Sequence, residues 1–248
     1  MKSVVFSIVS HGHQQMVQDF ICSLSTFLDS SDCDLKIVVR DNLNEGLELD
    51  PCGFVVIIER NYVQQGFGKN HNDTFCEFPC DFFFVLNPDL KLISPWKLAE
   101  MVDEVKDCVY TVSLVGEMGE NIGHIRNELT LVNVIRRKIG LVEKETTECW
   151  VSGAFLAFEW SVFANIGGFD ENFKMYVEDC DLCVRAQSQS FPLKLDKRVS
   201  LIHSAQRDSS KSIKLFMYHL ASLSYFMLKK IIFKFFHYDV GKYIIKKI

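Results

Sequence analysis

The sequence predicts an α/β fold in which helices cover both faces of a mostly parallel central sheet. Short apolar runs alternate with amphipathic stretches along the first half of the 248 residues. The apolar runs are continuous, which is typical of strands that are buried on both faces. Hydrophobic residues make up 48% of the chain and charged residues 24%. This balance matches a globular domain and excludes a disordered, collagen-like or coiled-coil protein.

The first half predicts regularly alternating elements. A strand at residues 4–9 precedes a helix at 13–28, where apolar residues recur with a helical period. Ser94 and Pro95 are typical of an N-cap and a first helical position, and predict a helix reaching about residue 106. The other expected elements are strands at 35–39, 54–59, 82–86 and 108–113, and a short helix at 68–76.

The second half is less regular. Residues 114–147 are richer in polar side chains, and we expect either a β-ribbon or a mobile loop there. The later pattern predicts a strand at 148–158, a helix at 160–166, a helix that starts near Asp179 and a strand at 193–202. We expect one domain at 1–210 and a tail at 211–248.

Charge separates the tail from the body. The formal net charge is −5, which disfavours a nucleic-acid binder that relies on bulk charge. Residues 211–248 contain eight lysines and one acidic residue, a charge of +7, which leaves −12 for the first 210 residues. A basic tail on an acidic body predicts contact with an anionic surface.

The nine cysteines predict reduced thiols in the cytosol, because no signal-peptide pattern opens the chain. Cys180 and Cys183 have the spacing of a zinc or redox motif. A structural zinc site needs a second pair, and Cys76 and Cys80 are more loosely spaced and lie a hundred residues away. We therefore expect core thiols rather than a metal centre.

Polar residues follow four predicted strands directly. In a doubly wound sheet the carboxyl ends of the strands line one ligand-binding crevice. Asn and Asp also terminate strands for local reasons, which is the alternative at each single position. The residues concerned are Ser10 and His11, Asp41 and Asn42, Asn61, and Asn87 and Asp89.

The segment with Asn87 and Asp89 predicts a cation site, and a glycine-bearing turn predicts close contact with a ligand. The buried run at 82–86 delivers Asp89 to a fixed point, and one or two carboxylates together with substrate phosphates are the usual ligands of Mg²⁺ or Mn²⁺. The turn containing Gly66, Gly68 and Asn72 would let the backbone approach a ligand closely.

A third cluster is acidic. Glu178, Asp179 and Asp181 fall within four residues at a predicted helix start, where the helix dipole keeps a carboxylate ionised and available as a base or ligand. An ordinary acidic N-cap is the alternative. His203 follows the late strand and would complete a metal site or contact a phosphate, unless it is a plain surface histidine.

Together these segments resemble the family 2 glycosyltransferases with the GT-A fold, in particular their bacterial rhamnosyltransferase-like branch. The resemblance covers about residues 4–211. Its most specific part runs from Gly167-Gly168-Phe169-Asp170-Glu171 to Glu178-Asp179-Cys180-Asp181-Leu182-Cys183-Val184-Arg185. The other matching segments are Val38–Asn42, Asn61, Gly66–Asn72, Leu86–Asp89, Trp150–Ala154 and His203.

The resemblance implies roles for individual residues. Asp41 matches the acid that contacts the nucleotide base, and Asp179, beside Glu178, matches the catalytic base. Asp89 matches the retained ligand of a Mg²⁺ or Mn²⁺ ion, with Asn87 in place of the first Asp of Asp-x-Asp, and His203 matches a histidine near the metal and diphosphate. The remaining expected donor contacts are Ser10, His11, Asn42, Asn61, Gly66, Gly68, Asn72 and Asn87, and the expected acceptor contacts are Trp150, Ser152 and Gly153.

The implied reaction is an inverting transfer of a sugar from a nucleotide-diphosphate donor to a hydroxyl of a lipid-linked oligosaccharide, in O-antigen or capsule-type synthesis. The donor favoured is dTDP-rhamnose, with UDP-sugars open. One alternative is a sugar-phosphate nucleotidyltransferase, which should carry a Gly- and Lys/Arg-rich loop where this chain has Ser10-His11-Gly12-His13. The other is a non-catalytic, membrane-associated scaffold, which the intact Glu178-Asp179 pair disfavours.

The tail has nine aromatic residues beside its lysines. It has no uncharged run of the roughly 18 residues that a spanning helix needs. We expect a basic amphipathic helix in the membrane interface, on the cytoplasmic face of the inner membrane. A helix packed on the domain, or in a homodimer interface, is the alternative.

Overall fold

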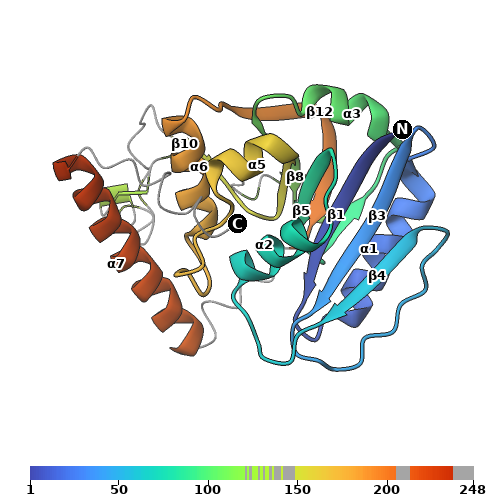
Figure 1. The fold of residues 1–248 in the computed structure, drawn as a ribbon, viewed down its shortest axis with the longest axis horizontal. Helices are drawn as coiled ribbons and strands as arrows, with labels where there is room; N and C mark the ends of the chain where they lie inside the picture. Colours follow the sequence, from blue (N-terminus) through green and yellow to red (C-terminus); the bar gives the residue numbers. More distant parts are fainter. Residues whose placement is uncertain are drawn as a thin grey trace.

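The computed structural model confirms the α/β architecture. It describes residues 1–120, 149–204 and 213–236, together with 122, 125–127, 129, 130, 132, 133, 136 and 141. An eight-stranded sheet in the order β4-β3-β1-β5-β11-β8-β12-β6 forms its centre (Figure 1). These strands are β1 (Lys2–Ser10), β3 (Cys33–Asp41), β4 (Val55–Arg60), β5 (Phe82–Leu86), β6 (Leu90–Leu92), β8 (Val109–Val115), β11 (Phe155–Glu159) and β12 (Leu193–His203).

Helices and two short strand pairs complete the described part of the chain. The helices are α1 (Gln14–Phe27), α2 (Phe67–Glu77), α3 (Leu98–Glu104), α5 (Trp160–Ile166), α6 (Glu178–Ser188) and α7 (Ile213–Phe236). The short pairs are β2 (Leu28–Asp29) with β7 (Trp96–Lys97), and β9 (Ile125–Asn127) with β10 (Cys149–Val151).

The sheet is parallel through its first half, as expected. Strands β4, β3, β1 and β5 run parallel, and so do β8 and β12. Strand β11 lies between β5 and β8 and is antiparallel to both, and β6 is antiparallel to β12. The reversal at β11 means that its beginning, and not its end, lies at the edge where β5 ends.

The continuous apolar run of β5 is explained by two cores. Phe82, Phe84 and Leu86 pack into the core that contains α1 and α3. Phe83 and Val85 point the other way, into the core that contains α2, α5 and α6. Successive side chains of a strand alternate between faces, so a strand covered on both sides needs apolar residues at every position.

Two expected boundaries are wrong. The helix expected from Ser94 and Pro95 begins only at Leu98, because Trp96 and Lys97 form β7, which pairs with β2. The expected strand at 148–158 is broken into β10 and β11 around Gly153. Within 114–147, the described residues include β9, which forms an antiparallel ribbon with β10, and the rest lies largely outside the described residues.

Helix α7 packs on the domain. Leu223 and Phe226 are buried in the core that contains α6, and Figure 1 shows α7 alongside that part of the molecule. This contact is the alternative considered for the tail, for the part that is described; residues 205–212 and 237–248 lie outside it. None of the described helices has an apolar stretch long enough to span a bilayer.

Candidate active site

The polar residues that follow β1, β3, β4 and β5 gather at one edge of the sheet. Ser10 and Asp41 are register partners, and the Asn61 amide donates to the Asp41 carbonyl at 3.0 Å. The Asn87 amide donates to the Ala154 carbonyl at 2.9 Å, which ties this edge to the start of β11. Segments far apart in sequence therefore meet at the carboxyl ends of the parallel strands.

Asp41 organises the connection that follows β3. Its carboxylate is 2% exposed and accepts the backbone N–H groups of Glu45, Gly46 and Leu47 at 3.1–3.2 Å. Burial acts to raise the pKa of Asp41, but these backbone hydrogen bonds outweigh it and hold that pKa below its usual value. An ionised Asp41 thus shapes the wall of the expected donor site.

Asn42 is the centre of an amide network. Its Oδ1 accepts from the Asn61 side chain at 2.7 Å and from the Gln65 backbone at 2.9 Å. Its Nδ2 lies 3.0 Å from the His11 ring, whose Nε2 also contacts Gln64. Burial, and then the charge of His13, lower the pKa of His11. Neutral His11 is thereby fixed beside the strand ends.

Ser10 has a local role. Its hydroxyl accepts the His13 backbone N–H at 3.2 Å, at the start of α1. The hydroxyl therefore satisfies an amide of the β1–α1 turn. Ser10 lies at the carboxyl end of β1, and its expected contact with the donor stays a prediction.

The turn before α2 does not open space for a ligand at every position that we expected. A Cβ at Gly68 would lie 2.5 Å from Phe169, and one at Gly66 would lie 3.0 Å from the Lys174 carbonyl. Asn72 accepts from the Phe169 amide and donates to the Phe169 carbonyl, both at 2.9 Å. Gly68 and Asn72 both hold the 167–174 segment against α2, and their contact with a donor stays a prediction.

Asp89 and His203 meet, as expected for a cation site. Strand β6 pairs with β12, and Asp89 Oδ1 lies 3.3 Å from His203 Nε2. Both side chains are largely buried, and Asp89 Oδ1 has no hydrogen-bond partner within the described residues. No group of three or more potential ligands gathers in the described part of the chain. A pair with an unsatisfied oxygen fits Mg²⁺ or Mn²⁺, which take their other ligands from phosphate and water.

Asp179 is oriented by backbone amides at the start of α6. Its Oδ2 accepts the Gly153 N–H at 3.0 Å, and its Oδ1 accepts the Cys180 N–H at 2.8 Å. A Cβ at Gly153 would lie 3.3 Å from the Asp179 Cβ, so a larger residue there would press on this carboxylate. Gly153 thus holds the side chain of Asp179, and its expected contact with the acceptor stays a prediction.

Glu178 and Asp179 have different electrostatic surroundings. Burial, and then the Asp179 charge, raise the pKa of Glu178 to about 8, and Glu178 Oε2 has no partner among the described residues. Burial also raises the pKa of Asp179, opposed by the Gly153 and Cys180 amides and by the charge of Arg126. Burial thus raises the pKa of both carboxyl groups, while the two backbone amides and Arg126 favour the ionised form of Asp179, which is the form that a base needs.

Arg126 is the site residue that the sequence did not reveal. It is the register partner of Trp150 in the β9–β10 ribbon, and its guanidinium lies 5.1 Å from the Trp150 ring centre. Trp150 is 6% exposed, and its indole N–H has no partner among the described residues. Arg126 lies in the segment 114–147, where no motif or periodicity marked it. Nearby, the Ser152 hydroxyl accepts the Ala154 amide at 3.3 Å.

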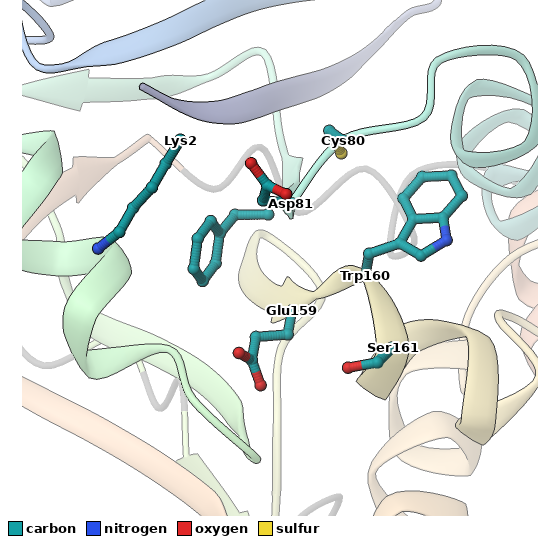
Figure 2. A pocket seen from close by; sticks show the side chains of 7 residues that line it. Lys2, Cys80, Asp81, Glu159, Trp160 and Ser161 are labelled. Carbon is teal, nitrogen blue, oxygen red and sulfur yellow. The ribbon is translucent and has the colours of Figure 1, made fainter.

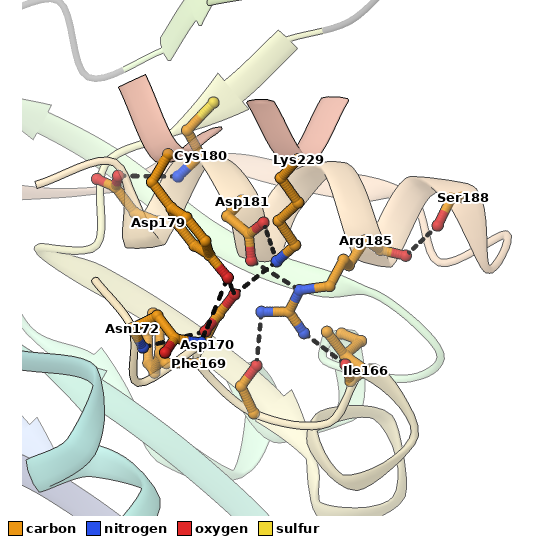
Figure 3. A network of polar contacts seen from close by, with 12 residues as sticks. Ile166, Phe169, Asp170, Asn172, Asp179, Cys180, Asp181, Arg185, Ser188 and Lys229 are labelled. Atoms are coloured by element: carbon orange, nitrogen blue, oxygen red, sulfur yellow. Dashed lines mark hydrogen bonds and ion pairs between the residues drawn. The ribbon is translucent and has the colours of Figure 1, made fainter. Parts of the chain in front are cut away.

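The third carboxylate of the acidic cluster, Asp181, is structural. It accepts from Arg185 at 2.8 Å and from Lys229 of α7 at 2.6 Å, and Lys229 also bonds Asp170 at 2.7 Å (Figure 3). Arg185 donates to the Gly168 carbonyl at 2.8 Å. The three acids thus have different partners: Asp181 is ion-paired, Glu178 Oε2 has no partner among the described residues, and Asp179 accepts two backbone amides.

Gly167 and Gly168 are required by backbone geometry. Both have positive φ angles, 83° and 64°, which residues with side chains rarely adopt. They end α5 and turn the chain toward Phe169 and Asp170, so that the following segment reaches α2 on one side and α7 on the other.

One hollow lies away from these residues. It has a volume of about 450 Å³ and is lined by residues that include Lys2, Phe82 and Glu159 (Figure 2). Lys2 and Phe82 begin β1 and β5, and Glu159 ends the antiparallel β11. The hollow is therefore at the amino ends of the parallel strands, opposite the edge where ligands bind in such sheets. We do not assign it to the donor.

The two cysteines of the C-x-x-C motif are core residues. Cys180 and Cys183 are free thiols, 1% and 0% exposed. Burial raises the pKa of Cys180 far above its usual value. Both side chains thus lie in the core, where a free cysteine packs as a small apolar residue.

Comparisons with known proteins agree with the geometry. No family model matches the chain. The chain is 26% identical over 252 residues to the rhamnosyltransferase WbbL of Escherichia coli, covering 92% of this chain and 93% of WbbL.

Solved structures match at the level of the fold. PcManGT, a mannosyltransferase from Pyrobaculum calidifontis solved with GDP-Man and Mn²⁺, superposes with a TM-score of 0.63 at 14% identity, over 91% of this chain and 64% of that one. GalNAc-T7, solved with UDP, GalNAc and Mn²⁺, gives 0.62 at 14% identity, over 82% and 43%. The chain thus spans less than two thirds of these structures. The chain has the GT-A glycosyltransferase fold and resembles the rhamnosyltransferase-like branch, as the motifs indicated.

Proposed function

We propose that the protein is an inverting glycosyltransferase that moves a sugar from a nucleotide-diphosphate donor to an acceptor hydroxyl. The observation that supports this most directly is the position of Asp179. Gly153, which holds the Asp179 carboxylate, precedes Ala154, and Ala154 bonds Asn87, two residues before Asp89. A base and a cation-binding pair therefore belong to one connected edge of the sheet.

Asp179 is the proposed general base. A hydroxyl is a poor nucleophile at neutral pH, and a carboxylate that removes its proton during attack accelerates the reaction by about 10²–10⁴-fold. The raised pKa of Asp179 makes it a stronger base than an exposed carboxylate. The amides of Gly153 and Cys180 fix its direction. A single displacement at the anomeric carbon inverts its configuration.

Asp89 and His203 are the proposed holders of a divalent cation, Mg²⁺ or Mn²⁺. Such a cation neutralises the negative charge that develops on a leaving diphosphate. Mn²⁺ accompanies the nucleotide ligands of GalNAc-T7 and PcManGT. In this chain the unsatisfied Asp89 Oδ1 and the adjacent His203 Nε2 are the groups available to it.

The proposed donor is dTDP-rhamnose, with a UDP-sugar as the second candidate. Similarity to the rhamnosyltransferase WbbL and the Asn87-Pro88-Asp89 segment favour rhamnose. The proposed acceptor is a lipid-linked saccharide of O-antigen or capsule-type synthesis, contacted near Trp150 and Ser152. Such an acceptor would place the enzyme at the cytoplasmic face of the inner membrane.

The decisive experiment compares Asp179→Asn with the wild-type enzyme. We expect turnover to fall by at least ~10²-fold while donor affinity, measured by calorimetry, stays close to that of the wild type. Asp34→Asn is the matched control, because it removes the same charge at an exposed position at the start of β3. Near-normal turnover by Asp179→Asn would reject the assignment of the base.

Removal of divalent metal tests the proposed cation site. We expect EDTA to abolish transfer and added Mn²⁺ or Mg²⁺ to restore it, because Asp89 and His203 alone cannot neutralise a diphosphate. Asp89→Ala should require much more added metal for the same rate. Full activity in metal-free buffer would exclude this part of the proposal.

A sugar-phosphate nucleotidyltransferase is the alternative enzyme. It would produce pyrophosphate from a nucleoside triphosphate and a sugar phosphate, and the glycosyltransferase would not. Assaying both reactions on one preparation separates these functions from each other and from a non-catalytic scaffold.

A further inference from the structure

Two thiols touch at the surface, outside the site described above. Cys22 lies on α1, and Cys52 lies in the connection between β3 and β4, 30 positions later. Their sulfur atoms are 3.2 Å apart, closer than two unbonded sulfurs in ordinary contact. Cys22 is exposed and Cys52 is partly exposed, so small molecules in solution reach the pair.

One face of α1 fastens this connection. Gln14 Oε1 accepts the Glu48 amide at 3.4 Å, and Gln18 Oε1 accepts the Asp50 amide at 2.8 Å. Gln18 Nε2 lies 3.4 Å from Cys22 Sγ and 3.6 Å from Cys52 Sγ. Gln14, Gln18 and Cys22 are spaced four apart and so form one row on the helix. The thiol contact is the last of three attachments along that row.

The backbone around Cys52 presents its thiol to the helix. Cys52 has a φ of 48°, a left-handed conformation that is uncommon for residues other than glycine. Its N–H donates to Asp50 Oδ1 at 2.9 Å, and the Phe54 amide donates to the Pro51 carbonyl at 2.9 Å, closing a tight turn. A strained conformation held by two hydrogen bonds points to a function for the side chain that it orients.

We propose that Cys22 and Cys52 are a modification site, at which a small disulfide such as oxidised glutathione forms an intrachain disulfide. The Cys22 thiolate, its proton lost to solvent, attacks one sulfur of oxidised glutathione, forming a mixed disulfide and releasing one glutathione thiolate. The Cys52 thiolate then attacks Cys22 Sγ and releases the second glutathione. The protein loses two hydrogens, and one glutathione disulfide becomes two thiols.

The order of the two steps follows from the pKa of Cys52 and the greater exposure of Cys22. The hydrogen bond with Cys22, and then burial, raise the pKa of Cys52 to about 11. Cys52 is therefore mostly protonated at neutral pH and is the poorer first nucleophile. Cys22 is more exposed and reacts with the oxidant, and Cys52 completes the exchange from 3.2 Å away.

The disulfide would restrain a wall of the nucleotide site. The connection that contains Cys52 also contains Glu45, Gly46 and Leu47, whose amides hold Asp41. A covalent bond at Cys52 fixes the far end of this connection to α1. Formation of the disulfide does not depend on the proposed function. Only the statement that the restrained connection is a wall of the nucleotide site rests on the proposed function.

The test treats the full chain with oxidised glutathione and measures its intact mass, its peptide map and the hydrogen exchange of residues 43–54. We expect the loss of two hydrogen masses, a linked Cys22–Cys52 peptide, and slower amide exchange in 43–54 that reverts with a reductant. Cys52→Ser should instead keep a glutathione adduct on Cys22. Cys76→Ser, which removes an exposed thiol on α2, should behave as the wild type.

Two results would overturn the proposed modification site, and a third would overturn only the restraint that its disulfide imposes. The first is a stable glutathione adduct on wild-type Cys22 without a cross-link. The second is loss of two hydrogens by Cys52→Ser, which would place the disulfide elsewhere. The third is a Cys22–Cys52 bond that leaves amide exchange in 43–54 unchanged, which would remove the restraint on the nucleotide wall.

Discussion

Adjacent carboxyl groups have different surroundings because their nearest neighbours differ. Glu178 is 7% exposed and its Oε2 has no partner among the described residues, and burial raises its pKa to about 8. Burial also raises the pKa of Asp179, but Asp179 accepts two backbone amides and feels the charge of Arg126, which favour its ionised form. The amides and Arg126 therefore favour the charged form that a base requires.

Arg126 should set the pH range in which Asp179 works. Because its positive charge lowers the pKa of Asp179, Arg126→Gln should raise that pKa further. As the pH falls, Asp179 would then become protonated at a higher pH than in the wild type. The acid limb of the kcat/KM profile should therefore move toward neutral pH, with little change in kcat/KM at pH values well above that limb. Arg126→Lys retains the charge and should retain the wild-type limb. An identical acid limb in Arg126→Gln would show that Arg126 does not act on the base.

At the scale of elements, the start of α6 is held from two sides. Gly153 bonds Asp179 from the β10–β11 turn, and Lys229 bonds Asp181 from α7. The two residues before α6, Tyr176 and Val177, have positive φ angles of 69° and 74°, which are strained for residues with side chains. The Tyr176 ring stacks on His219 of α7 at 5.2 Å. Helix α7 thus supports the segment that presents the base.

Lys229→Met should destabilise the fold. Lys229 is the cation shared by Asp170 and Asp181, and its loss leaves Asp170 buried without a positive partner among the residues that the structure describes. Breaking such a pair typically costs about 3 kcal/mol of unfolding free energy, which urea denaturation at pH 7 would measure.

The stabilisation by the Asp170–Lys229 ion pair should depend on pH. Burial opposes ionisation of Asp170, but the charge and hydrogen bond of Lys229 hold its pKa below the usual value. The stabilisation is therefore present above the unfolded-state pKa and disappears as the pH falls through the folded-state pKa.

The double variant is the control for Lys229→Met. Lys229→Met with Asp170→Asn should recover part of the loss at pH 7. A single variant as stable as the wild type would mean that the ion pairs contribute nothing.

At the scale of the whole molecule, α7 has two unlike faces. Its inner face carries Leu223, Phe226 and Lys229, which contact the domain. The large apolar side chains that are exposed on the helix are Met217, Leu220, Leu228, Ile231 and Ile232. A helix whose inner face is already packed can present such an outer face to a membrane interface, as the lysine-rich tail suggests.

Flotation with liposomes tests that role. We expect the full chain to float with anionic vesicles and less with zwitterionic ones, because lysines near an anionic surface contribute about 1 kcal/mol each. The variant with serine at Leu228, Ile231 and Ile232 should lose most of this binding. Serine at Leu43 and Val63, which are exposed elsewhere, is the matched control. Equal flotation of the two variants would exclude α7 as the anchor.

Much of the fold could be predicted because the burial of each strand determines its pattern of apolar residues. The run Phe82–Leu86 is apolar at every position because β5 has a core on each face. The end of this run predicted that Asp89 lies at the carboxyl edge of the sheet. The helix expected at Ser94 began late because pairing between β7 and β2 overrides a local capping signal. The contact of Asn72 with the Phe169 backbone could not be predicted, because the two residues are 97 positions apart.

The sequence by itself determined the strands, the chemical types of residue at their ends, and the acidic start of α6, since local periodicity and motif spacing encode them. Only the tertiary structure decided which groups meet: Asp89 with His203, Asp179 with Gly153, Asp181 with Lys229, and Cys22 with Cys52. These pairings arise from strand order and helix packing, which bring together residues that no local pattern connects. Electrostatic character depends on such pairings, so the raised pKa of Glu178 and the amides that favour ionised Asp179 follow from the folded chain alone.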